Sequence, residues 1–206
     1  MLKTLNSLTD KIPGELTNQI RRLVYEPDSN PFDLSFPTWT ARWWKWLHSI
    51  PNENSPALDR TGEFCDRSQH HPHVWFLAGT LGGSATRKCN IPSEKAILFP
   101  IITSAFSYAV DPYLRTEEEL TKTTKEDIDK VSKLKLKLND TIFDDIRKFR
   151  IRSDPFDDVI NGQPTRAVSD GYWIFLKPLH SGKLKIYFVG ENVDFFNEVT
   201  YYISIF

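Results

Sequence analysis

Apolar residues recur along this chain at two spacings, a helical one in the first quarter and a two-residue one after residue 74. In the helical part, Ser35 or Thr38 can cap the first turn, Pro37 suits that turn, and Pro51 follows the last one. The segment between them predicts a tryptophan-rich helix with one continuous apolar stripe. That stripe contains Trp39, Trp43, Trp46, Leu47 and Ile50.

After residue 74 the apolar runs are short and bounded by Gly, Pro or Asn, which favours strands. Residues 74–78 and 96–102 fit buried strands, and the chain ends in three strands, predicted to be antiparallel, over 171–179, 183–189 and 199–206. Alternate residues of the last two share a face, namely Leu184, Ile186 and Phe188, and Val199, Tyr201, Ile203 and Ile205. We therefore predict a mainly β fold: an antiparallel β-sandwich, jelly-roll or Ig-like, with the Trp-rich helix and one or two peripheral helices.

Two other segments complete the organisation. Residues 1–32 are expected to form a polar N-terminal extension with a short helix over 15–24, ahead of a single sandwich domain over 33–206. Within that domain, about 113–150 is a charged insertion, predicted as a helix that starts in a capping box at Thr116 and then as an edge hairpin. In the hairpin, lysine alternates with leucine and would keep the edge from pairing with other chains.

Composition narrows the function classes. Among 206 residues, 26 Lys and Arg face 27 Asp and Glu, for a formal charge of −1, which argues against a nucleic-acid binder. No apolar run is long enough for a membrane span, and the polar start does not fit a signal peptide. The compartment stays open, and a secreted or surface form is possible if a leader has been removed.

Two cysteines, Cys65 and Cys89, admit three interpretations. A disulfide between them would stabilise the fold by about 3.5 kcal/mol through loop closure. The alternatives are unpaired thiols, or a reactive thiol, which would need a neighbouring base or companion metal ligands.

Several motifs together support a resemblance. They are the Trp39–Trp46 helix, Asp59-Arg-Thr-Gly62, the run Val74–Thr80 with Gly82-Gly83, Arg87-x-Cys89-x-Ile-Pro92, Lys95–Ile101 and Ser169–Leu179. Over about residues 33–206 the chain resembles a family of uncharacterised microbial β-rich proteins, often exported, with no established activity. Its last strands also resemble those of Ig-like surface modules. The resemblance implies the fold and brings no catalytic residues.

The strongest candidate for chemistry is His70-His-Pro-His73. In an extended segment His71 and His73 project to the same side, as a two-imidazole clamp for a divalent transition metal requires, with His70 beside them. A third ligand would come from elsewhere, with Cys65 and Asp66 among the nearby options. The alternative is a solvated loop before a strand.

Four further residues are candidates for ligand binding: Trp44, Trp75, Asp170 and Trp173. The Trp39–Trp46 segment could offer a stacking platform for sugar rings, although core packing is the simpler role. Trp44 lies off the apolar stripe, beside Ala41 and His48, and is therefore the indole expected to face a ligand or partner. Asp170 could act as an acid or base at a sheet rim, or form a turn with Gly171.

These features give three functional hypotheses. The first is a non-catalytic sandwich module that binds a small molecule, glycan or protein, with no cofactor. The second is a metal-dependent enzyme built on His71 and His73. The third is a structural or surface-associated protein. Neither a phosphate-binding loop nor a nucleophile-elbow motif is present in the sequence.

Overall fold

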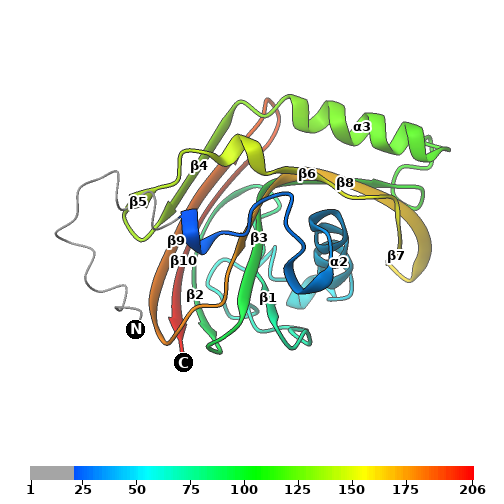
Figure 1. Cartoon of the computed structure of the whole chain (residues 1–206). Coiled ribbons are helices and arrows are strands. Elements are labelled where there is room, and N and C mark those ends of the chain that lie inside the picture. The colour runs from blue at the N-terminus through cyan, green and yellow to red at the C-terminus, as the bar shows by residue number, and fades with distance from the viewer. Residues whose placement is uncertain (1–20) are drawn as a thin grey trace.

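Two β-sheets packed face to face, with a helix against the second face of one of them, make up the molecule (Figure 1). The structure is a computed structural model that describes residues 21–206. The helix predicted over 15–24 falls largely outside the described residues. The mainly β prediction with two sheets is confirmed.

The helical elements come early and in the middle of the chain. They are η2 (Pro31–Asp33), α2 (Phe36–His48), η3 (Asn52–Asn54), α3 (Glu117–Asp129) and η4 (Ile146–Phe149). Within residues 21–206, no helix is long and apolar enough to cross a membrane.

Within residues 21–206, each sheet contains five strands. In sheet A the order is β1 (Val74–Phe76), β3 (Ala96–Ser107), β8 (Gln163–Leu176) and β6 (Arg150–Arg152), and β7 (Phe156–Ile160) also pairs with β8. In sheet B it is β2 (Gly83–Ile91), β10 (Phe196–Ile205), β9 (Gly182–Glu191), β4 (Lys133–Leu138) and β5 (Thr141–Ile142).

The pairing differs from the prediction in two respects. Both sheets are mixed rather than purely antiparallel, because β1 runs parallel to β3 and β2 parallel to β10. The last three strands do not form one antiparallel set either, since β9 pairs with β10 while β8 pairs with β3 in the other sheet. Sequence alternation defines which residues share a face, but it does not identify the neighbouring strand.

The main core lies between the sheets. The alternate residues predicted to share a face on β9 and β10 are all buried there, opposite Phe99 of β3 and Ile174 of β8. Phe99 stacks on Phe188 of β9 with ring centroids 5.4 Å apart. The sheets approach closely at Gly190, where a Cβ atom would lie 2.7 Å from the carbonyl oxygen of Ile101.

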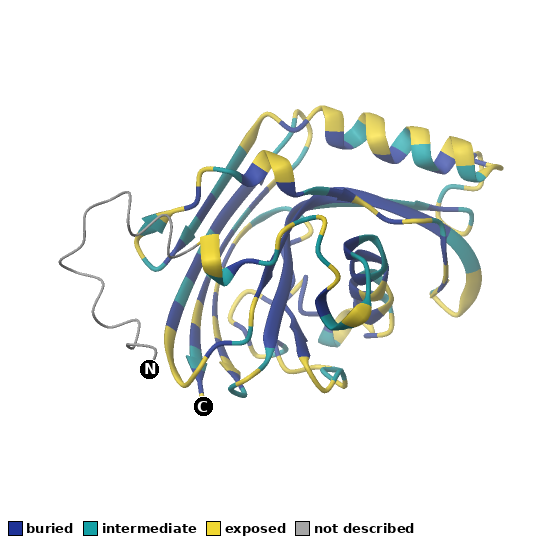
Figure 2. Ribbon diagram, viewed as in Figure 1, coloured by how far each residue is buried: buried dark blue, intermediate teal, exposed yellow. Residues whose placement is uncertain are grey.

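A second core lies between sheet A and α2. Ser35 caps α2 by accepting a hydrogen bond from the Thr38 amide, and the helical repeat turns the predicted indole stripe toward the sheet. The stripe packs on Trp173 and Phe175 of β8. Sheet A is therefore covered on both faces, and β3 and β8 are buried over long runs, while the strands of sheet B alternate between buried and open (Figure 2).

The charged segment over 113–150 forms the predicted helix and hairpin. Thr116 and Glu119 make the capping box of α3, and Leu120 and Ile128 of that helix are buried. The alternating lysines and leucines form β4, which pairs with β9 over its full length and so adds a strand to sheet B. Asn139 and Asp140 form the turn that leads to β5.

The cysteines form a disulfide that joins the loop before β1 to β2, as predicted in one of the three interpretations. Next to it, Arg87 of β2 is buried, and its guanidinium donates to the carbonyl oxygens of Asp59, Ala78 and Gly79. Two loop segments, one around Asp59 and the other at Ala78 and Gly79, are thereby attached to one strand.

Candidate functional site

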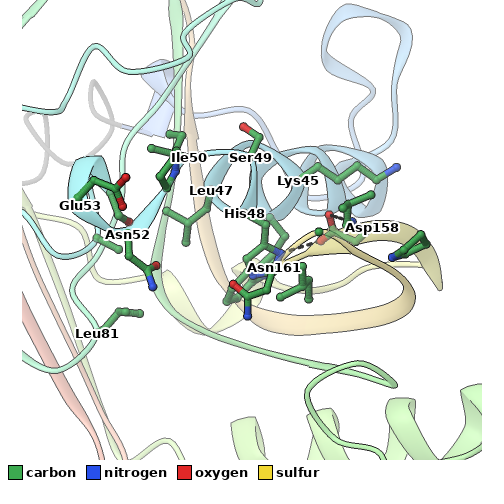
Figure 3. Close-up of a pocket in the computed structure, with 18 of the residues that line it drawn as sticks. Lys45, Leu47, His48, Ser49, Ile50, Asn52, Glu53, Leu81, Asp158 and Asn161 are labelled. Atoms are coloured by element: carbon green, nitrogen blue, oxygen red, sulfur yellow. Dashed lines mark hydrogen bonds and ion pairs between the residues drawn. The ribbon is translucent and has the colours of Figure 1, made fainter.

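A groove of about 950 Å³ lies between the C-terminal half of α2, the segment after it, and the β7–β8 hairpin (Figure 3). Leu47, Ile50 and Ala57 contribute buried apolar surface, and Leu81 and Val159 are exposed at its border. Polar groups lie along the same groove on Lys45, His48, Asn52, Glu53, Asp157 and Asn161.

Local sequence explains how the two walls form. Trp44 and His48 are four residues apart on α2, off the buried stripe, and their rings lie 5.2 Å apart. The opposite wall is a hairpin whose turn, Asn161-Gly162, has positive φ at both residues, as tight hairpin turns require. Alternation along β7 then buries Asp158 and exposes Val159.

The two walls meet in a side-chain contact between His48 and Asp158. The Nδ1 atom of His48 lies 2.7 Å from Oδ2 of Asp158, and the amide of Val159 donates to the other carboxylate oxygen at 2.8 Å. The Asp158 side chain is only 4% exposed, whereas that of His48 is 21% exposed. Because the buried carboxylate engages Nδ1, Nε2 is the ring nitrogen left to interact with another molecule. Figure 3 shows His48 directed from the helix toward the hairpin.

Hydroxyl side chains are few in the groove. Its two serines, Ser49 and Ser55, are the hydroxyl groups among its lining residues. Ser49 donates to the carbonyl oxygen of Trp46, and Ser55 is buried. A histidine held by a carboxylate can accept a proton or hydrogen-bond a ligand hydroxyl, but nucleophilic catalysis also needs a nucleophile within reach of that histidine.

Trp44 is the one predicted ligand-binding residue that lines this groove. It packs on Ala41, Phe156 and Ala167, and its Nε1–H group is buried without a hydrogen-bond partner among the described residues. It also lines an adjoining hollow of about 110 Å³ that reaches Asn197. Ligand contact at Trp44 stays a prediction.

Trp75 and Trp173 occupy core positions. Trp75 is 6% exposed between the sheets, and Trp173 is fully buried under α2, where its ring meets that of Trp43 at 5.3 Å. Neither indole offers an exposed face to a ligand in this structure, and ligand binding at these two residues stays a prediction. From the sequence alone, both residues are candidates for an exposed aromatic platform because both are tryptophans. In the structure, the second sheet covers Trp75 and α2 covers Trp173.

Asp170 is also buried, and a role as ligand-binding acid or base stays a prediction. It is 2% exposed and accepts hydrogen bonds from Nε and Nη2 of Arg150 at 3.1 and 2.8 Å. Arg150 also donates to Asp129 of α3, so the pair connects that helix to β6 and β8. These carboxylates raise the pKa of Arg150.

The three histidines of the predicted metal site lie in the loop before β1. His71 Nδ1 accepts hydrogen bonds from the amides of His73 and Val74, the His73 ring stacks on Phe32, and His70 is exposed. Desolvation lowers the pKa of His71, and the positive charges of Arg42 and Lys95 lower it further. Across residues 21–206 no group of three or more His, Cys, Asp or Glu side chains is arranged to hold a metal ion.

Sequence reasoning missed His48, Asp158 and Asn161. Two signals could have found them: the Asn-Gly dipeptide after an alternating run predicts a hairpin, and the four-residue spacing of Trp44 and His48 places both on one helix face. Comparison of the chain with family models, curated proteins and solved structures finds no match. The resemblance to an uncharacterised microbial family therefore stays a prediction.

Proposed function

We propose that this protein is a non-catalytic binding module whose groove takes a small, neutral, hydroxyl-rich ligand with one apolar face, of which a short oligosaccharide is the best example. The observation that carries the proposal is the His48–Asp158 pair in the groove wall. A histidine held in this way offers a ring nitrogen with a defined direction to a ligand hydroxyl.

The remaining lining supports a ligand of mixed character. Leu81 and Val159 are 64% and 53% exposed and offer apolar contact, while the amides of Asn52 and Asn161 can donate to and accept from hydroxyl groups. Sites for small molecules combine such apolar surface with a few placed polar groups. The carboxylate of Asp158 is already paired, so the groove has no isolated buried charge that would demand a charged ligand.

The test is calorimetric titration with maltopentaose, cellopentaose and xylopentaose. We expect at least one to bind, and both His48→Gln and Asn161→Gly to weaken it about tenfold, the equivalent of about 1.4 kcal/mol. Glycine keeps the positive φ at position 161, so the hairpin is retained while the amide is lost.

The matched control is His180→Gln. His180 pairs with Glu94 at 2.8 Å on the exposed surface, outside the residues that line the groove, and its loss should leave affinity unchanged. The proposal is wrong if none of the three oligosaccharides binds, or if the control variant weakens binding as much as His48→Gln does.

A further inference from the structure

The face of sheet B that points away from the core carries a concentration of lysines that the net charge of the chain conceals. Strand alternation sends the apolar residues of β4, β9, β10 and β2 inward and their polar residues outward. The outward lysines are Lys88, Lys133, Lys135, Lys137, Lys183 and Lys185. We call this surface the lysine face.

Strand register places these lysines in rows across the sheet. Tyr202 of β10 is opposite Lys88 on one neighbouring strand and Lys185 on the other. In the next row, Lys137 is opposite Tyr187. Neighbouring strands are about 4.8 Å apart, so the positive charges lie within reach of successive units of one polymer chain.

Carboxylates neutralise only part of the lysine face. Glu191 pairs with Lys133 at 3.1 Å, Glu198 accepts a hydrogen bond from the Tyr187 hydroxyl, and Asp140 lies in the turn after β4. In the described part of the chain, four of the six lysines have no ion pair and no hydrogen bond from their ammonium group: Lys88, Lys135, Lys137 and Lys185. Two shallow hollows of about 350 and 570 Å³ lie on this surface, around Tyr202 and Lys185.

We infer that the lysine face binds an acidic polysaccharide, at a site separate from the groove. Charge complementarity requires a polyanion, and the hydroxyl and amide groups of Thr86, Thr200 and Asn90 between the lysines suit a hydroxylated chain. The occupant is thus a carboxylated or sulfated glycan of several units.

Two observations favour a glycan over a nucleic acid. The ammonium groups of Lys135 and Lys185 lie 5.5 and 5.8 Å from the ring centres of Tyr187 and Tyr202, so a lysine competes with a base for one face of each ring. The disulfide between Cys65 and Cys89 is typical of oxidising compartments, in which acidic glycans rather than nucleic acids are the common polyanions. A membrane surface is disfavoured because, in the two rows around Tyr202 and Tyr187, Ile142 of β5 is the one exposed aliphatic side chain among the described residues, and a single such residue offers little apolar surface for insertion.

The experiment measures binding of the full chain to polygalacturonate and heparin at low and moderate NaCl. We expect one or both to bind with an affinity that falls as salt rises. The variant Lys88→Gln/Lys137→Gln/Lys185→Gln should bind at least tenfold more weakly. Because these side chains point into solvent, their replacement should leave the melting temperature nearly unchanged, and circular dichroism checks this.

The matched control is Lys122→Gln/Lys130→Gln/Lys177→Gln, which removes the same charge from exposed positions outside sheet B. The inference is overturned if neither polymer binds, if the control variant loses as much affinity, or if a thymidine oligonucleotide or phosphatidylserine vesicles bind more tightly than both glycans. The groove variants His48→Gln and Asn161→Gly should leave this binding intact, so the two proposals succeed or fail separately.

Discussion

Arg87 and Tyr201 meet in the core through the hydrogen bond that Nη1 of the arginine donates to the phenol oxygen at 2.7 Å. The Tyr201 hydroxyl in turn donates to the carbonyl oxygen of Ala78, which Arg87 also contacts. Burial raises the pKa of Tyr201, so its hydroxyl stays protonated and keeps this donor. A buried positive charge is thus held by carbonyl and phenol oxygens, and no carboxylate pairs with it within residues 21–206.

The first prediction concerns this contact. Arg87→Met should lower the free energy of unfolding by about 3 kcal/mol or more, because several buried carbonyl groups lose their donor. Tyr201→Phe should cost about 1–2 kcal/mol. Urea unfolding of both single variants and the double variant measures the coupling, and additive losses would show that the two side chains act independently.

The disulfide gives a second prediction. Cys65 and Cys89 are 24 positions apart, and opening the closed loop should lower the free energy of unfolding by about 3.5 kcal/mol. Guanidinium unfolding of Cys65→Ala/Cys89→Ala, compared with the parent protein with and without a reductant, measures this. A loss below about 1 kcal/mol would contradict the estimate.

A third prediction follows from His71. Its folded-state pKa is lowered from the ordinary value of 6.5, by desolvation first and then by the charges of Arg42, His73 and Lys95. The folded state therefore binds a proton less readily than the unfolded state. The free energy of unfolding therefore keeps its full value, as far as His71 is concerned, above about pH 6.5. It declines as the pH falls toward the folded-state pKa of His71.

Protonation of Nδ1 would also remove the acceptor for the amides of His73 and Val74. His71→Asn retains an acceptor oxygen and should reduce the loss of stability between pH 7.5 and 5.5, measured by urea midpoints. His70→Asn is the control because His70 is exposed. An unchanged pH dependence in His71→Asn would exclude His71 as its source.

The fourth prediction compares two buried indoles in contact. Trp43 donates its Nε1–H to the carbonyl oxygen of Leu77 at 2.9 Å, whereas the same group of Trp173 has no partner among the described residues. Both substitutions to phenylalanine remove the same atoms, but only Trp43→Phe leaves a carbonyl group unpaired. Its loss of stability should exceed that of Trp173→Phe by about 1 kcal/mol. Equal losses in chemical denaturation would contradict this reasoning.

The features that the sequence alone predicted correctly each lie within one helix or strand. The capped helix with its indole stripe, the capping box at Thr116, and the shared faces of β9 and β10 depend on spacing within one element. Such spacing is set by backbone geometry, which is why these predictions are confirmed.

Strand partners and the groove were decided only by the tertiary structure. His48 and Asp158 are 110 positions apart, and the sequence of neither segment identifies the other as its partner. Trp173 and Asp170 look like surface groups until α2 and Arg150 cover them. The physical reason is that the burial of a side chain and its charge partner depend on residues from distant segments that folding brings together. The spacing of apolar residues, in contrast, describes one segment at a time.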